Sequence, residues 1–172
     1  MRRDAEFTDY LEARLAWLRR TAFLLCQDWQ RADDLVQAAA MRLYLRWARI
    51  RRLEQVDAYV RAILVREFLS EHRSGWASRV SLPGRVPDAV VQAGDLDTAL
   101  DVRAALARLP PRQRATLVLR FYCDLNVYQT AQVLDCSPGT VKSQTAKGLD
   151  ALRRALEPSV AQGWPGPGEG TR

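Results

Sequence analysis

The sequence predicts an all-α protein with two small helical domains joined by a flexible linker, the C-terminal one carrying a helix-turn-helix. Apolar residues recur every three or four positions, and no stretch alternates with the period of two that a half-buried strand requires. Between residues 74 and 95 this periodicity stops and glycine and proline accumulate. We therefore divide the chain into an N-terminal domain (5–73), a linker (74–95), a C-terminal domain (96–156) and a disordered tail (157–172).

The N-terminal half contains three amphipathic patterns, each of which predicts a helix. The first begins at Phe7 and ends near Leu25, the second follows Asp33 and Asp34, and the third begins at Asp57. Carboxylates suit the first turn of the second helix because they oppose the positive end of the helix dipole. These patterns predict a three-helix bundle that ends near residue 73.

In the C-terminal half, helical spacing resumes at Leu96 and stops at the pair Pro110-Pro111. Another helix is expected from Arg112 to Cys123. The tail from Pro158 onward holds three prolines and four glycines, a composition typical of disordered segments.

Two short helices follow with a tight turn between them. Asn126 and Gln129 have the spacing of a capping box and start a helix that ends near Leu134. Ser137 followed by Pro138 starts the next, because serine caps well and proline is tolerated at the first helical position. This arrangement predicts a helix-turn-helix.

The second of these helices has two unlike faces. Five residues are expected to lie toward the core: Val141, Thr145, Gly148, Leu149 and Leu152. The opposite arc carries Lys142, Ser143, Ala146 and Lys147, and its two small residues would let the backbone approach a DNA groove closely. A solvated basic helix face is the alternative interpretation, and the capped turn favours DNA.

Charge supports a polyanionic partner. The formal net charge is +6, and the basic excess falls in residues 1–80 and 96–156 in equal measure, which indicates two basic modules. Neutralised phosphates release counterions, so nucleic acid is the first candidate.

Other classes of protein are disfavoured. His72 is the single histidine, and no nucleophile or phosphate-loop spacing accompanies it, so we do not expect an enzyme. Cys26, Cys123 and Cys136 show no CxxC pairing and read as buried or incidental thiols, so no metal or cofactor is expected. The chain has no signal-like or membrane-spanning apolar run, which predicts no membrane insertion and a cytoplasmic location. Trp17 and Trp47 fall within helical patterns and are expected in the core or at a domain edge rather than under DNA bases.

Several runs then resemble extracytoplasmic-function (ECF) sigma factors of the sigma-70 family. In the C-terminal half these runs are Leu109-Pro-Pro-Arg-Gln-Arg, Leu117-Val-Leu-Arg-Phe-Tyr, Thr130-Ala and Cys136-Ser-Pro-Gly-Thr-Val-Lys-Ser; in the N-terminal half they are Ala32-Asp-Asp-Leu-Val-Gln and Asp57-Ala-Tyr-Val-Arg-Ala-Ile-Leu-Val. The resemblance implies a C-terminal domain that binds the −35 promoter element. It also implies an N-terminal domain that docks on core RNA polymerase and melts the −10 element. A dedicated anti-sigma factor is a third partner that the resemblance allows.

The resemblance also assigns roles to residues. The −35 element would be contacted by Lys142, Ser143, Gln144, Ala146 and Lys147, with Thr140 and Arg112 near its phosphates and Arg114 as a further DNA contact. Polymerase would be contacted by Asp34, Leu35, Gln37 and Arg42. The −10 element would meet Arg61, Arg66, His72 and Arg73, and the loop 51–56 would capture a base after melting.

Three positions depart from the family pattern. Ala38 stands where a glutamate is usual, Arg66 where an asparagine helps line the base pocket, and Glu67 where an apolar residue is usual. These departures keep open a sigma-like decoy unable to melt promoters. A transcription regulator of another class with the same helix-turn-helix is a separate alternative. A regulator of the second kind would carry a receiver domain of alternating strands and helices, which the N-terminal half does not predict.

Overall fold

The computed structural model describes residues 2–50, 53–73 and 96–161. The predicted linker, residues 51 and 52 of the expected base-capture loop, and the tail beyond residue 161 lie outside the described residues. In chain order the elements are α1 (Arg2–Cys26), α2 (Trp29–Arg46), a 3-10 turn η1 (Trp47–Arg49), α3 (Leu53–Arg73), α4 (Leu96–Arg108), α5 (Pro111–Leu117), a π-helical turn η3 (Val118–Tyr122), α6 (Val127–Leu134) and α7 (Pro138–Ala161). No strand occurs in these residues, so the predicted all-α class is confirmed.

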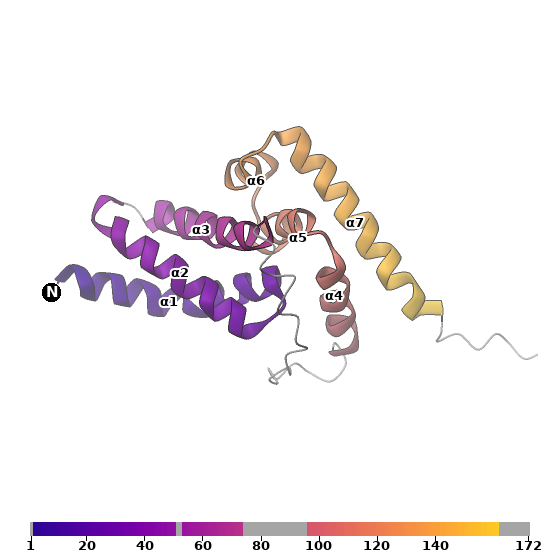
Figure 1. The fold of residues 1–172 in the computed structure, drawn as a ribbon, viewed down its shortest axis with the longest axis horizontal. Coiled ribbons are helices and arrows are strands. Elements are labelled where there is room, and N and C mark those ends of the chain that lie inside the picture. The colour runs from indigo at the N-terminus through magenta and orange to yellow at the C-terminus, as the bar shows by residue number, and fades with distance from the viewer. Residues whose placement is uncertain (1, 51–52, 74–95, 162–172) are drawn as a thin grey trace, which may run out of the picture.

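Helices α1, α2 and α3 form the N-terminal bundle, with α1 and α2 antiparallel and α3 packed on both (Figure 1). The second helix begins at Trp29, earlier than the sequence pattern indicated, because the Asp28 side chain caps it by accepting from the Arg31 N–H at 2.8 Å. Asp33 lies inside the helix, and its carboxylate pairs with Arg19 of α1. The expected start at Asp33 and Asp34 was therefore wrong.

The third helix also begins before its predicted start. It starts at Leu53, and Asp57 lies within it, where its carboxylate binds two side chains of α1. Tyr10 donates its hydroxyl to Asp57 at 2.8 Å, and Arg14 pairs with the same carboxylate at 3.0 Å. Asp57 thus ties α3 to α1. Trp17 and Trp47 pack against the core, as expected.

In the C-terminal half, α7 lies across α4, α5 and α6 (Figure 1). Gly148 makes the crossing with α5 close: a Cβ at this position would lie 3.0 Å from the Leu117 Cδ1 atom. The helix continues to Ala161, past the expected end of the domain at residue 156.

The two halves pack against each other, which the sequence did not predict. Buried residues of the C-terminal half, including Val118, Leu119 and Leu134, belong to the same hydrophobic core as Leu64 and Phe68 of α3. Helix α3 contacts α5 and α6, and α1 contacts α4, α5 and η3. The described parts of the two domains therefore share one core.

Candidate nucleic-acid interface

The helix-turn-helix has the predicted caps. The Asn126 side chain accepts from the Gln129 N–H at 2.9 Å, and the Gln129 side chain accepts from the Asn126 N–H at 2.9 Å. Asp135 ends α6 in the left-handed conformation (φ 51°), and Ser137 Oγ accepts from the Thr140 N–H at 3.1 Å. These bonds satisfy backbone groups that would otherwise be unpaired at the helix ends and so fix the angle at which α7 leaves the turn.

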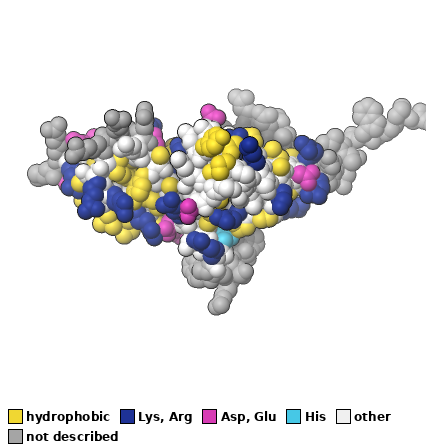
Figure 2. Space-filling view, turned by 90° about the horizontal axis from the view of Figure 1, so that it is seen from above, with side chains coloured by type: hydrophobic (Ala, Val, Ile, Leu, Met, Phe, Trp, Pro, Cys, Tyr) yellow, Lys and Arg dark blue, Asp and Glu magenta, His cyan; other side chains and the backbone are white. Residues whose placement is uncertain are grey.

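The expected DNA-reading face of α7 is open to solvent. Lys142, Ser143, Ala146 and Lys147 are all exposed, while Val141 and Gly148 on the opposite side are buried. Figure 2 views the molecule from the side on which α6 and the start of α7 lie in Figure 1, and basic side chains are spread over this whole side while acidic ones are fewer. Leu149 departs from expectation because it is partly exposed rather than packed inward.

The two arginines of α5 that were expected to contact DNA lie in different surroundings. Arg112 is exposed at the start of α5, with one guanidinium N–H donating to the Leu134 carbonyl oxygen at 3.3 Å. Arg114 is only 8% exposed, and its guanidinium donates to three backbone carbonyls inside the protein. Burial lowers the pKa of the Arg114 guanidinium below its usual range. In this structure Arg114 cannot reach DNA, and our expectation that it is a DNA-binding residue is corrected.

Helix α2 presents part of the predicted polymerase surface. Asp34, Gln37 and Arg42 are exposed, and the Arg42 guanidinium pairs with Glu67 of α3 at 2.8 Å. Leu35 is 1% exposed and belongs to the core, so no partner can reach it. That assignment is corrected, and the reason is that the helical stripe containing Leu35 faces α1 and α3.

Sequence reasoning missed two apolar residues on the outer face of α2. Met41 is 71% exposed and Leu45 is 79% exposed, and both follow Asp34 and Gln37 at helical spacing. Contiguous apolar surface is typical of binding sites, whereas single exposed apolar side chains are common on any protein, so the helical spacing of Met41 and Leu45 is what makes them a candidate surface. The signal was available, because neither residue fits the apolar stripe that predicted the core.

The four residues expected at the −10 element all lie on α3. Arg66 and Arg73 are exposed. Arg61 is half-buried, and its guanidinium carbon lies 5.4 Å from the Trp17 ring centre. His72 is half-buried, with Nδ1 2.8 Å from the Phe68 carbonyl oxygen. Half of this set is therefore covered within the structure.

One groove joins residues expected to bind different promoter elements. Its volume is about 780 Å³, and its lining from α3 includes Arg66, His72 and Arg73. Across the groove lie Arg112 and Gln144, which were assigned to the −35 element. The fold thus brings the two expected DNA sites against one another.

The described residues offer no group of three side chains that could hold a metal ion, and all three cysteines are free. Among the described helices, none is both long and apolar enough to cross a membrane.

Two parts of the chain match models of known protein families. Residues 10–78 match the model of sigma-70 region 2, and residues 99–152 match that of sigma-70 region 4. The chain is 35% identical over 156 residues to the RNA polymerase sigma-E factor of Streptomyces avermitilis, covering 88% of this chain and 86% of that protein. It is 30% identical over 139 residues to the ECF RNA polymerase sigma factor SigM of Mycobacterium tuberculosis, covering 81% of this chain and 71% of that protein.

A solved structure shares the arrangement of helices. The sigma factor RpoE from Bartonella quintana, crystallised with the anti-sigma factor NepR, superimposes with a TM-score of 0.72 and 27% sequence identity. The match covers 88% of this chain and 97% of that one. The capped helix-turn-helix, the two matched regions and these relatives together show that this chain belongs to the extracytoplasmic-function sigma factors of the sigma-70 family.

Proposed function

We propose that this sigma factor directs core RNA polymerase to promoters whose −35 element is read by the exposed face of α7. The observation that carries the proposal is the combination of Lys142 and Lys147 with the small residues Ser143 and Ala146 behind a doubly capped turn. Lysines can bond the acceptors of guanine in the major groove, and small neighbours allow the helix to approach the bases. Arg112 and Thr140 would bind the flanking phosphates.

Polymerase docking is assigned to the outer face of α2. Asp34 and Gln37 supply polar contacts, and Met41 and Leu45 supply the apolar area that a protein interface needs at its centre. Arg42 is exposed and could contribute from the edge, but its pairing with Glu67 means that it also ties α2 to α3.

The −10 function is assigned to the N-terminal domain, residues 5–73, with Arg61, Arg66, His72 and Arg73 as its contacts and the C-terminal domain at 96–156 holding the −35 site. Transcription factors of this kind are not enzymes, and we place the action of this one in the cytoplasm with the polymerase. Since RpoE of Bartonella quintana was crystallised with NepR, an anti-sigma protein is a further proposed partner.

A decoy that cannot melt promoters is the alternative. Glu67 was one argument for it, but its carboxylate pairs with Arg42 at 2.8 Å and so has a structural role between two helices. This pairing accounts for an acidic residue at a usually apolar position and so removes Glu67 as an argument for the decoy.

Run-off transcription tests the proposal. A random duplex pool is first selected with the purified protein to obtain its preferred −35 sequence, and a template library carrying that sequence upstream of a randomised −10 region is transcribed with core polymerase. Specific transcripts that depend on the protein are the expected result. If the protein binds the duplex and the polymerase tightly but gives no transcript, the decoy is favoured. If it binds neither the duplex nor the polymerase, the proposal is overturned.

A further inference from the structure

The groove between α3 and the C-terminal half has the size of a small-molecule site. One wall is the C-terminal end of α3, and the other combines the start of α5, the end of α6 and the first turns of α7, where α6 lies over the end of α3 (Figure 1). Its volume of about 780 Å³ lies within the roughly 300–1,000 Å³ that is typical of small-molecule sites. A DNA duplex or a folded partner is too large to enter it, so the groove suits one small ligand.

Positive charge dominates the lining of this groove. Arg66 and Arg73 stand on the α3 wall and Arg112 on the opposite wall, whereas Asp135 is the one carboxylate among the described lining residues. All three arginines are exposed, and neither Arg66 nor Arg73 forms an ion pair with any residue that the structure describes. Guanidinium groups bind phosphate oxygens through paired, charge-assisted hydrogen bonds. Cations on both walls therefore favour an anion with more than one phosphate group, which can bridge them.

Apolar side chains make up much of the remaining lining. They include Leu69 of α3, Pro111 of α5 and Val133 of α6. Leu69 and Val133 also pack in the hydrophobic core, which holds this part of the groove in place. An inorganic anion would leave this apolar surface in water, whereas a nucleobase has flat apolar faces that would cover it. The ligand is therefore expected to join phosphates to an apolar ring.

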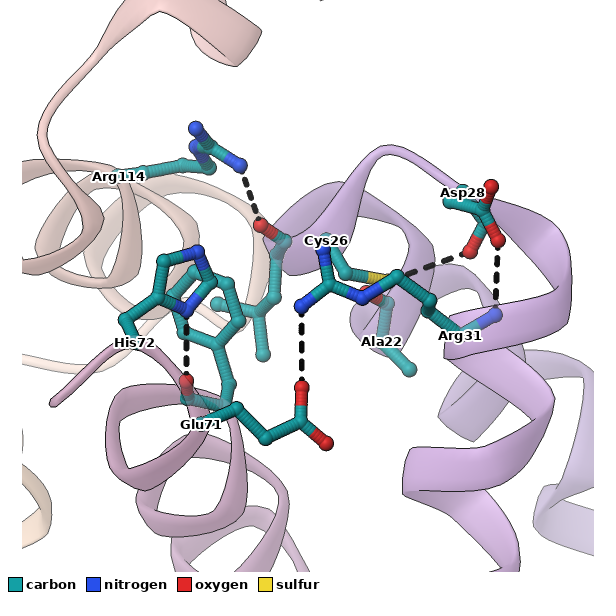
Figure 3. A network of polar contacts seen from close by, with 9 residues as sticks. Ala22, Cys26, Asp28, Arg31, Glu71, His72 and Arg114 are labelled. Atoms are coloured by element: carbon teal, nitrogen blue, oxygen red, sulfur yellow. Dashed lines mark hydrogen bonds and ion pairs between the residues drawn. The ribbon is translucent and has the colours of Figure 1, made fainter. Parts of the chain in front are cut away.

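Three further polar side chains contribute to the lining. Gln113 and Gln144 are half-buried, and each amide group both donates and accepts hydrogen bonds. His72 Nδ1 lies 2.8 Å from the Phe68 carbonyl oxygen, as Figure 3 shows; because a carbonyl only accepts, this nitrogen carries the proton. Side-chain amides can pair with the donors and acceptors on the edge of a nucleobase. The groove thus offers groups for both parts of a nucleotide.

We propose that this groove binds a free nucleoside di- or triphosphate. Its phosphates bridge Arg66 and Arg73 of α3 to Arg112 of α5, and its base packs on the apolar lining within reach of the two glutamine amides. The same arginines are proposed DNA contacts, so a bound nucleotide competes with promoter DNA for them. The binding itself is separate from the promoter function proposed above and needs neither polymerase nor DNA.

Isothermal titration calorimetry of the free protein at constant ionic strength tests the proposal. ATP and GTP are the probes, compared with AMP, adenosine, inorganic triphosphate and a single-stranded oligonucleotide without terminal phosphates. The test variant is Arg66→Gln combined with Arg73→Gln, both exposed positions whose change leaves the core intact. Its matched control is Arg153→Gln combined with Arg154→Gln, which removes the same charge from exposed positions of α7 outside the groove. Circular dichroism verifies that both variants are folded.

ATP or GTP is expected to bind at least about tenfold more tightly than adenosine, and the Arg66→Gln, Arg73→Gln protein should lose at least about tenfold of that affinity, because it lacks charge-assisted bonds to the phosphates. The control should bind within about twofold of the wild type. Gln113→Ala combined with Gln144→Ala should weaken ATP or GTP binding but not the binding of inorganic triphosphate, since only a nucleotide has a base for the amides to contact.

Four results would overturn the proposal. The first is absence of binding by both nucleotides. The second is equal affinity for nucleotides and inorganic triphosphate, which would make the groove a simple anion site. The third is an equal loss of affinity in the control variant, which would place the nucleotide elsewhere or make its binding non-specific. The fourth is displacement of ATP by the oligonucleotide at a lower concentration than by GTP, which would assign the groove to single-stranded DNA. Because no arm uses polymerase or a promoter, none of these results counts against the proposed function.

Discussion

Arg114, in the C-terminal half, donates a hydrogen bond to the backbone carbonyl of Leu25 at the end of α1, with 2.7 Å between the two atoms. The donor and acceptor are separated by 89 residues in sequence. The last carbonyl groups of a helix have no partner within the helix. The bond from Arg114 therefore satisfies the Leu25 carbonyl, which would otherwise be unpaired inside the core. A single side chain thereby joins the C-terminal half to α1.

Removal of this side chain should destabilise the protein. Arg114→Met keeps similar length and apolar bulk but leaves buried carbonyls of Leu25 and Leu109 without donors, so we expect a loss of about 1–3 kcal/mol in the free energy of unfolding. Urea denaturation followed by circular dichroism measures it. Arg154→Met is the control, because its ion pair with Asp150 is exposed and should contribute less than about 0.5 kcal/mol. Equal stability of the two variants would show that Arg114 is dispensable.

Substitutions of the expected base-reading residues and of the expected phosphate-binding residue should affect DNA binding in different ways. Lys142→Ala or Lys147→Ala should cost about 1–3 kcal/mol on the preferred duplex and relax the preference at one base position. Arg112→Ala should weaken binding to all sequences together and reduce the salt slope by roughly one unit. Fluorescence anisotropy over a salt series checks both. If the lysine variants lose affinity for every sequence equally, those lysines contact phosphate only.

The apolar residues of α2 should control polymerase binding. Met41→Ala together with Leu45→Ala is expected to weaken core polymerase binding by at least about tenfold, because truncation of buried apolar anchors removes interface area. Helical content should stay unchanged, since both side chains are exposed in the free protein. Leu15→Ala on α1 is the matched control, also a partly exposed leucine. Affinity for core polymerase is measured in a competition assay. If the double variant and the control both bind as tightly as the wild type, α2 is not the docking surface.

Charge reversal provides a separate test of the same helix. Asp34→Lys changes an exposed position outside the core, so we expect weaker holoenzyme formation with little change in thermal stability. Asp150→Lys, on the exposed side of α7, carries the same change of charge away from α2. Identical polymerase affinity for the two variants would contradict the assignment of Asp34.

The two described glycines of α7 should respond differently to alanine. A Cβ at Gly139 would meet only the Ser137 Oγ atom at 3.7 Å, whereas a Cβ at Gly148 would lie 3.0 Å from Leu117 Cδ1. Gly139→Ala should be neutral or stabilising by up to about 1 kcal/mol through helix propensity. Gly148→Ala should lose that gain because α7 must move away from α5. Thermal denaturation measures the stability of the two variants. An equal gain in stability in both would show that the Leu117 side chain moves aside without cost.

Stability should fall at alkaline pH through Cys26. Burial raises the pKa of this thiol to about 11, and its Sγ–H donates to the Ala22 carbonyl oxygen at 3.0 Å. Because the folded state holds the proton more tightly than the unfolded chain, the stabilisation is complete below the unfolded pKa and is lost as the pH rises toward 11. The free energy of unfolding should therefore drop more between about pH 8 and pH 10.5 in the wild type than in Cys26→Ala. If the free energy of unfolding changes with pH in the same way in both proteins, the Cys26 thiol is not the cause of the change.

The sequence by itself determined the helical class, the capped helix-turn-helix and the outward face of α7. These features depend on local physics: Asn126 and Gln129 cap one another across one turn, and the residues of α7 fall on two faces because the helix repeats every 3.6 residues. Helix starts were less accurate, because Asp28 supplied a cap that the apolar pattern did not show.

Only the tertiary structure decided which polar residues are available to a partner. Arg112 and Arg114 are two positions apart in one motif, yet one is exposed and the other is buried against Leu25 and Phe68. Leu35 likewise became a core residue, while Met41 and Leu45 remained open. The local sequence pattern determines where a side chain points relative to its own helix. Whether that side of the helix is exposed to solvent depends on contacts between segments far apart in the chain, and these form only when the two halves dock.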